Sequence, residues 1–423
     1  MDTERILGTA YRPRILDSAL TEALASAGAV LVEGVRACGK TMTALHAASS
    51  YVFLDDPLAI QMREIAPQSL LEGSRPRLLD EWQTAPELWN LVRREVDRSG
   101  STAQFILTGS SVPADDATRH SGAGRFLRVR QRTLTWRERS GVDASVSVAA
   151  LFEGQPIAPG PASMTYGEII DQLAGSGFPA MTQLSADRQQ RRLRAYVEEI
   201  THTDIHRIAD VRHSSVLLDA LLRALARSSA SEVSYRTLAA DVARVAPAIS
   251  AETIAGYVDL FARLFVLERQ AAWAPRLTSR ARLRTSDRIH LADPALSIAA
   301  LGASAERLAG EPATVGMIFE SAVYHDLSVF MATLGGSVHH YRDSNGHEID
   351  MVAVLPSGAW AAIEVKLGAG QIPAAATSLR RAIDQIDVAS AGDPAFRLII
   401  TGTGPTLTLD DGTITAPLSA LGP

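Results

Sequence analysis

The sequence predicts a multidomain α/β protein, and three patterns along the chain predict it. Residues 29–110 alternate between short apolar runs and helical runs, which is typical of βαβ units around a parallel sheet. Helical periodicity resumes at Asp187, and several short helices follow up to Leu267. Strand-like runs prevail after Ser337. We therefore expect a parallel-sheet domain over 1–180, a helical domain over 181–290 and an α/β domain over 291–423.

The composition is that of a globular protein and excludes a basic nucleic-acid coat. The chain has 423 residues, of which 46% are hydrophobic, and its net charge is -6. Its one cysteine, Cys38, excludes an internal disulfide. We see no signal peptide and no apolar run long enough to span a membrane, so we expect a cytoplasmic protein without membrane contact. The cations are almost all arginine, and lysine occurs only at positions 40 and 366.

The first domain is expected to contain strands and helices in alternation. The predicted strands are 29–33, 51–54, 77–80 and 104–108, with a further strand within 125–138, and the predicted helices are 40–48, 57–72 and 86–98.

The first apolar strand is followed by a phosphate-binding motif. Residues 34–41 match the pattern G-x-x-x-x-G-K-[ST] at every fixed position, between a strand and a helix. Glycines let the backbone curl so that its N–H groups point at phosphate oxygens, and the helix N-terminus adds positive potential. Lys40 is expected to reach the β- and γ-phosphates, and the Thr41 hydroxyl to bind Mg²⁺. The predicted nucleotide cradle comprises Gly34, Val35, Arg36, Ala37, Cys38, Gly39, Lys40 and Thr41.

Two further strands end in polar residues that suit nucleotide hydrolysis. The strand 77–80 ends in two carboxylates, and we expect Asp80 to hold the Mg²⁺ shell and Glu81 to polarise the attacking water. The strand 104–108 leads into Ser110, whose hydroxyl could sense the γ-phosphate. The alternative for Ser110 is an ordinary serine-rich turn.

These motifs resemble an AAA-related group of bacterial and archaeal ATP-binding proteins that carry a C-terminal domain of unknown function. The resemblance rests on 79–83 (Leu-Asp-Glu-Trp-Gln), 105–111 (Phe-Ile-Leu-Thr-Gly-Ser-Ser), the Gly-Arg motif 121–125 and the Gly-Phe-Pro turn 177–179. It implies ATP rather than GTP, and a γ-phosphate contact from Arg125. A solvated charge is the alternative for Arg125, and residues 133–136 depart from the Pro-Leu-Ser-like stretch of the group.

The middle of the chain reads as two capped helices, 234–242 and 250–258, which resemble the winged helix of the same group. Glu252 and Asp259 make the second helix too acidic for a typical DNA-recognition helix. The alternative to DNA recognition is that the winged helix packs as a lid. A basic stretch runs from Arg269 to Arg288. The best phosphate-backbone contacts for DNA or RNA are Arg280, Arg282 and Arg284, which would share one face of a strand, although a solvated strand is the alternative.

The C-terminal region contains a second set of residues suited to phosphate chemistry. Glu364 and Lys366 are two residues apart on a predicted strand and so face the same side, near Asp350 on the preceding strand. Asp350 and Glu364 could hold Mg²⁺, with Lys366 beside them. Together with Glu320 on a helix, this pattern resembles the PD-(D/E)XK nuclease core. An edge hairpin with ordinary surface charges is the alternative.

Three functional hypotheses follow. The first is an ATPase coupled to a Mg²⁺-dependent nuclease-like domain that acts on nucleic acid. The second is an ATP-dependent regulatory switch, in which a non-cleaving nuclease-fold domain binds a partner or DNA. The third is a sequence-specific DNA-binding regulator. Each is compatible with an oligomer.

Overall fold

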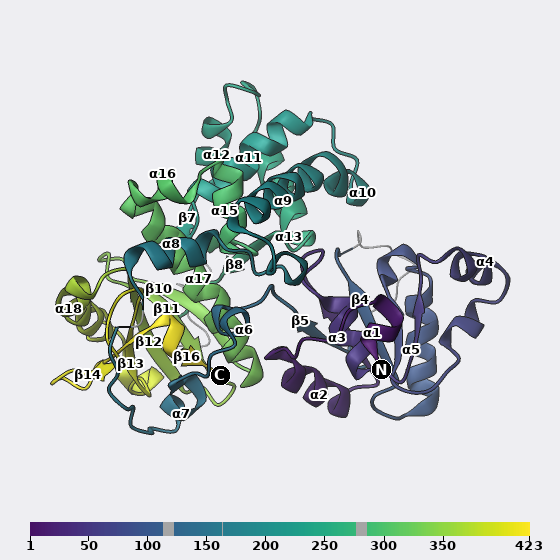
Figure 1. Cartoon of the computed structure of the whole chain (residues 1–423), viewed down its shortest axis with the longest axis horizontal. Coiled ribbons are helices and arrows are strands. Elements are labelled where there is room, and N and C mark those ends of the chain that lie inside the picture. The colour runs from purple at the N-terminus through teal and green to yellow at the C-terminus, as the bar shows by residue number, and fades with distance from the viewer. Residues whose placement is uncertain (113–121, 163, 276–285) are drawn as a thin grey trace. The chain divides into compact units, whose positions relative to one another are not determined.

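A computed structural model describes residues 1–112, 122–162, 164–275 and 286–423 (Figure 1). The chain divides into two compact units. Unit 1 comprises Met1–Thr133, Asp204–Asp210 and Leu260–Val266, and unit 2 comprises Leu134–Thr203, Val211–Asp259 and Leu267–Pro423. The predicted nucleic-acid contacts Arg280, Arg282 and Arg284, and the first residue of the Gly-Arg motif, Ser121, lie outside the described residues.

Unit 1 is built around a five-stranded sheet in the order β2-β3-β4-β1-β5, and every neighbouring pair of strands is parallel. The strands are β1 (Ala29–Glu33), β2 (Ser50–Phe53), β3 (Arg77–Asp80), β4 (Phe105–Gly109) and β5 (Phe126–Arg130). The helical elements are α1 (Thr3–Leu7), α2 (Leu16–Ser26), α3 (Lys40–Ala47), α4 (Pro57–Ile65), α5 (Leu88–Ser99) and α10 (Ile205–Ile208), with 3-10 turns η1 (Pro67–Leu71) and η2 (Trp82–Thr84). The predicted parallel-sheet core is thus confirmed.

Both faces of this sheet are covered, because the central strands are apolar on both sides. Leu31 of β1 packs in one cluster with Trp89 and Val92 of α5. Val30, the next side chain along β1, faces the other side and packs with residues of α2 and α3. Because all five strands are parallel, their carboxyl ends meet at one edge of the sheet, where the connecting loops can bring polar residues together.

The first part of unit 2 is mainly helical. Its elements are α6 (Trp136–Ser140), β6 (Val146–Ser147), α7 (Val148–Phe152), α8 (Tyr166–Ala174), η3 (Pro179–Met181), α9 (Ala186–Glu199), the π-turn η4 (Ile200–Asp204), α11 (Ser215–Arg227), β7 (Ser231–Glu232), α12 (Tyr235–Asp241), α13 (Ala251–Arg263), β8 (Leu267–Gln270) and β9 (Arg288–Leu291). The last residues of η4 and α13 are counted with unit 1. Strands β7, β9 and β8 form a small antiparallel sheet in that order.

The second part of unit 2 is a six-stranded mixed sheet in the order β10-β11-β12-β13-β15-β14. The first three strands are antiparallel, and β13 then runs parallel to β12 after the helix α18 has crossed over. The elements are α15 (Pro294–Leu301), α16 (Ala305–Ala309), α17 (Pro312–Thr333), β10 (Ser337–Arg342), β11 (Glu348–Val354), β12 (Trp360–Lys366), η5 (Ala369–Gln371), α18 (Ile372–Ile383), α19 (Val388–Ala391), β13 (Arg397–Thr401), β14 (Leu407–Thr408), β15 (Ile414–Pro417), η6 (Leu418–Ala420) and β16 (Leu421–Gly422). Strand β16 pairs with β6.

The division between the units lies earlier than the predicted boundary at residue 180. The amide of Leu134 donates to the carbonyl of Gly177 at 2.7 Å, and the amide of Trp136 donates to the carboxylate of Asp326 at 2.8 Å. The half-buried Arg139 donates to the carbonyls of Gly175 and Gln172. These buried polar contacts tie the segment after Thr133 into unit 2. The helical and C-terminal parts belong to one compact unit, and the boundary at residue 290 between them stays a prediction.

Among the described residues, no helix combines the length and the apolar character needed to cross a membrane.

Replacing Asp326 by alanine should destabilise unit 2. Asp326 is 1% exposed, accepts from the Trp136 amide and lies near the buried Arg139 guanidinium. Its loss leaves a buried donor and a buried cation without this partner, which costs about 3 kcal/mol. Chemical denaturation followed by circular dichroism would measure the loss. Asp143→Ala is the matched control, because Asp143 is fully exposed and should leave the unfolding midpoint unchanged.

Candidate functional site

The predicted nucleotide cradle lies at the carboxyl edge of the unit 1 sheet. Residues 34–39 connect the end of β1 to the start of α3, as expected for a phosphate loop. Ala37 and Gly39 have φ values of 65° and 101°, which curl the loop backbone. Gly34 has no room for a side chain, because a Cβ there would lie 2.0 Å from the carbonyl oxygen of Gln131.

The side chain of Lys40 folds back onto the backbone of this loop. Its Nζ donates to the carbonyl oxygens of Gly34 and Val35, each at 3.0 Å, and its side chain is buried. The ammonium group is thus held over the curled backbone, where a phosphate oxygen could replace a carbonyl as its acceptor.

Asp80 connects three elements of the sheet edge. One carboxylate oxygen, Oδ1, accepts from the Thr108 hydroxyl at 2.6 Å, and the other, Oδ2, accepts from the Thr41 hydroxyl at 3.3 Å. Burial, and more weakly the charge of Glu81, raises the pKa of Asp80 to about 6. A hydroxyl and a carboxylate in contact are oxygen ligands of the kind that Mg²⁺ prefers, so Thr41 and Asp80 fit this metal.

Glu81 is held by residues at the end of β4 and in η2. Its backbone has a φ of 57°, which is uncommon outside glycine and marks a locally constrained position. The amide of Glu81 donates to the Thr108 hydroxyl at 2.9 Å, and its Oε2 accepts from the Ser110 hydroxyl at 3.2 Å. Gln83 donates to the same carboxylate oxygen and to Ser110. No role was predicted for Gln83, and the signal that could have indicated one is its position two residues after Glu81.

Arg125 is not part of this constellation, contrary to the predicted γ-phosphate contact. Its carbonyl accepts from the amide of Ala29, at the start of β1, whereas the phosphate loop follows the end of β1. Strand geometry separates these two ends by about 15 Å. The Arg125 side chain also pairs with Asp97 of α5 at 2.8 Å. The structure thus places Arg125 at the opposite edge of the sheet, because β5 is parallel to β1 and begins just after Arg125.

The second predicted site forms a cluster of charges in unit 2. Asp350 of β11 and Glu364 and Lys366 of β12 come together, with Lys366 Nζ 2.8 Å from Glu364 Oε1 and 3.6 Å from Asp350 Oδ2. Asp350 Oδ2 also accepts from the amide of Val365 at 2.9 Å. Glu364 Oε2 is buried and has no hydrogen-bond partner within the part of the chain that the structure describes.

Glu320 of α17 joins this cluster through an arginine that the sequence did not indicate as part of it. Arg288, the first residue of β9, lies 2.7 Å from Glu320, 2.9 Å from Glu348 and 3.5 Å from Asp350. It was counted with the exposed basic stretch, yet its side chain is only 6% exposed. The signal that could have found it is its place at the start of an apolar strand, Ile289 to Leu291.

The carboxylates of this cluster are strongly affected by burial. Burial first, and then the charge of Asp350, raises the pKa of Glu364 to about 7 and that of Glu320 to about 8. Burial alone would lower the pKa of Lys366, but Asp350 and Glu364 raise it above its ordinary value. Among the described side chains, no three His, Cys, Asp or Glu residues are arranged to hold a metal ion.

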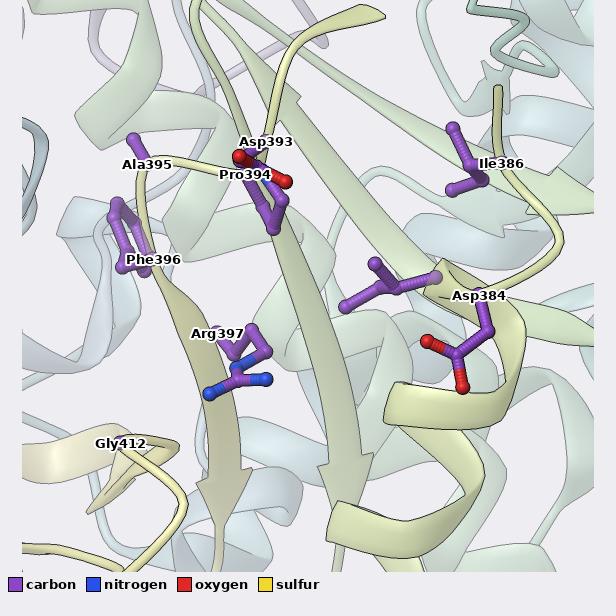
Figure 2. A pocket seen from close by; sticks show the side chains of 9 residues that line it. Asp384, Ile386, Asp393, Pro394, Ala395, Phe396, Arg397 and Gly412 are labelled. Carbon is purple, nitrogen blue, oxygen red and sulfur yellow. The ribbon is translucent and has the colours of Figure 1, made fainter. Parts of the chain in front are cut away.

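A pocket of about 570 Å³ opens at the other end of the same sheet. Figure 2 shows Arg397 at the start of β13 and Asp384 just after α18 among its lining residues. Glu364 and Lys366 lie at the carboxyl end of β12, which is parallel to β13. None of the predicted site residues lines this pocket, so it belongs to neither predicted site.

The comparisons with known proteins agree with this geometry in the N-terminal part. Residues 26–140 match the family described as AAA domain. The match supports an AAA-related P-loop domain in this segment, as predicted from the phosphate loop and the two carboxylates that follow it.

The rest of the chain matches families without an assigned role. Residues 167–307 match a domain of unknown function (DUF8612), and residues 315–421 match a domain of unknown function (DUF4143). Among solved structures, the chain is similar to the Walker-type ATPase PABY2304 of Pyrococcus abyssi. The identity is 14%, the match covers 68% of this chain and 95% of that chain, and the TM-score is 0.42. The comparison with curated proteins gave no match.

Nucleotide binding by the AAA-related domain should weaken in acid through Asp80. Because the pKa of Asp80 is about 6, this carboxyl group is protonated below that pH and loses the charge with which it would hold Mg²⁺. The Mg²⁺-dependent part of the affinity should fall by up to about tenfold per pH unit below 6. A fluorescent ATP analogue titrated between pH 5 and 8 would measure it.

Asp80→Asn is the matched control for this pH dependence. The amide cannot titrate, so the variant should bind weakly at every pH and show only the titration of the nucleotide itself. An unchanged pH profile in Asp80→Asn would contradict the assignment.

Proposed function

We propose that the chain binds and hydrolyses ATP at the carboxyl edge of the unit 1 sheet. The observation that carries the proposal is the contact of Thr41 with Asp80, beside Glu81 and at the end of the curled phosphate loop. The match to the AAA domain family supports ATP as the nucleotide.

Each residue has a distinct role in this proposal. The loop amides and Lys40 hold the β- and γ-phosphates, and Lys40 exchanges its carbonyl acceptors for phosphate oxygens. Thr41 and Asp80 would hold Mg²⁺, and a bound Mg²⁺ would offset the charge that develops on the phosphates. Glu81 accepts a proton from the attacking water, and Ser110 and Gln83 orient its carboxylate. Ser110 is also placed to sense the state of the γ-phosphate through its bond to Glu81.

We further propose that the C-terminal domain has a PD-(D/E)XK nuclease-type fold. Three antiparallel strands, a crossover helix and a parallel fourth strand support this fold. Asp350 and the Glu364–Lys366 pair lie on the second and third of these strands, and Glu320 lies on the helix that precedes them. All four residues fall in the match to the domain of unknown function over 315–421.

The cluster in this arrangement does not fit a catalytic Mg²⁺. Arg288 and Lys366 already contact the carboxylates that would hold the metal, and both oxygens of Asp350 are engaged. These contacts favour the second of the predicted functions, an ATP-dependent switch whose C-terminal domain binds a partner or nucleic acid without cutting it. A phosphodiester cleavage step is therefore not part of the proposal.

Variants of the phosphate loop and of Glu81 test the ATPase proposal. Lys40→Ala should lose ATP binding, whereas Glu81→Gln should keep binding and lose hydrolysis by about 10²- to 10³-fold, because it lacks the proton acceptor. Arg125→Ala is the matched control and should hydrolyse ATP within about twofold of the wild type, since Arg125 lies at the opposite sheet edge. Equilibrium binding and phosphate release measure the two properties separately. Hydrolysis at the wild-type rate in Glu81→Gln would refute the assigned role.

Cleavage assays separate the switch from the nuclease. The wild-type chain with ATP and either Mg²⁺ or Mn²⁺ should leave single- and double-stranded DNA and RNA intact, because Arg288 and Lys366 engage the acids. Asp350→Ala serves as the reference for contaminating nucleases. Cleavage by the wild type that disappears in Asp350→Ala would establish the nuclease instead.

A further inference from the structure

Arg288 is the most enclosed cation of the unit 2 cluster. Its guanidinium reaches from β9 of the small three-stranded sheet to carboxylates on α17 and β11. Nη1 lies 2.7 Å from Glu320 Oε1 and 3.5 Å from Asp350 Oδ1, and Nη2 lies 2.9 Å from Glu348 Oε2. One side chain thus contacts three acids. Asp350 is one of the two carboxylates predicted to hold Mg²⁺, and Glu320 belongs to the same nuclease-like pattern.

The chemistry of the guanidinium suits this position. It is planar, stays charged at every accessible pH, and presents several N–H donors in a fixed fork. A divalent cation would draw the same carboxylates together by its charge. Arg288 does so with hydrogen bonds that are directed at individual oxygens.

Arg288 is also held firmly where it lies. Its partner across the strand pair, Gln270 of β8, donates from Nε2 to the carbonyls of His339 at 2.9 Å and Asp350 at 3.0 Å. The amide of Trp273, further along the same segment, donates to the carbonyl of His340 at 2.7 Å. The small sheet is therefore bonded directly to β10 and β11, and this bonding fixes the backbone from which Arg288 projects.

We infer that Arg288 is the resident cation of this acidic cluster and occupies the place that a divalent metal would take. Glu320 and Asp350 bind Arg288, and Glu364 binds Lys366, so the native cluster is balanced by protein cations. The remaining oxygen, Glu364 Oε2, is buried without a hydrogen-bond partner among the described residues. We expect it to contribute to a metal site once Arg288 no longer balances Glu320 and Asp350. This assignment concerns the cluster alone and does not depend on ATP hydrolysis.

Metal binding by the full-length chain tests this inference without relying on an activity. Mn²⁺ binding is followed by electron paramagnetic resonance and calorimetry in the absence of nucleotide. The wild type should show no Mn²⁺ site that disappears in Asp350→Asn. Arg288→Gln should gain one site at least tenfold tighter than any wild-type site at the cluster, and the double variant Arg288→Gln/Asp350→Asn should lose it.

Arg342→Gln is the matched control. Arg342 also pairs with Glu348, at 3.3 Å, and with Glu232, at 3.5 Å, but it has no recorded ion pair with Glu320 or Asp350. Loss of this arginine should give no Mn²⁺ site. A gain of equal size in Arg342→Gln would show that any loss of positive charge suffices, and it would overturn the specific role of Arg288.

Two further measurements keep the inference testable if Arg288→Gln does not fold. Arg288→Lys retains a charge but places a compact ammonium where a fork was, so it should fold and gain a weaker site than Arg288→Gln. The comparison of wild type with Asp350→Asn needs no change at Arg288, and an Asp350-dependent Mn²⁺ site in the wild type would overturn the inference. Lys40→Ala should leave all of these results unchanged, which separates them from any failure of the ATPase proposal.

Discussion

The contacts of one buried carboxylate, Asp80, hold the candidate nucleotide site together. Asp80 ends β3, and its two oxygens accept from Thr41 at the start of α3 and from Thr108 near the end of β4. Thr108 in turn accepts from the amide of Glu81, so the same hydroxyl orients both carboxylates of the pair. Because parallel strands bring their carboxyl ends to one edge, three segments far apart in the sequence converge on this point. The phosphate loop, the proposed metal ligands and the proposed proton acceptor all depend on this convergence.

The carboxylates of the two acidic sites have different partners, hydroxyls at Asp80 and cations at Asp350. Asp80 is contacted by two hydroxyls, and burial raises its pKa to about 6 although these hydrogen bonds and the charge of Lys40 lower it. Such a carboxylate gains from a divalent cation. Asp350 instead lies near Lys366 and Arg288, and its oxygens are engaged by both cations and by an amide. A metal entering there would have to displace a cation that already forms directed hydrogen bonds, at a cost that the site at Asp80 does not have.

Most elements of the fold and most of the candidate site residues could be predicted locally, and the failures have a common physical cause. The strand at 29–33, the phosphate loop and the Glu364–Lys366 pair follow from periodicity and motif spacing, which act over a few residues. Arg125 and Arg288 were misplaced, because the sequence shows that a residue is charged but not which edge of a sheet it reaches. Because β5 is parallel to β1, Arg125 lies at the end of the sheet away from the phosphate loop. The pairing of β9 with β8 directs Arg288 toward the acidic cluster. Both depend on strand pairing between distant segments.

Lysine is nearly absent from the chain, and this affects how an arginine in the sequence should be interpreted. In a chain where arginine is the default cation, a basic stretch is weak evidence for a nucleic-acid surface, since arginine also serves inside. Arg139 is half-buried and donates to two backbone carbonyls, and Arg288 is buried and binds three acids. A planar fork can satisfy several acceptors at once, which a compact ammonium does less well. Lys40 and Lys366 each place a compact ammonium group against closely spaced acceptors. The acceptors are the backbone carbonyls of the phosphate loop for Lys40 and a pair of carboxylates for Lys366. Each of the two lysines therefore lies at one of the two candidate sites, whereas an arginine by itself indicates no site in this chain.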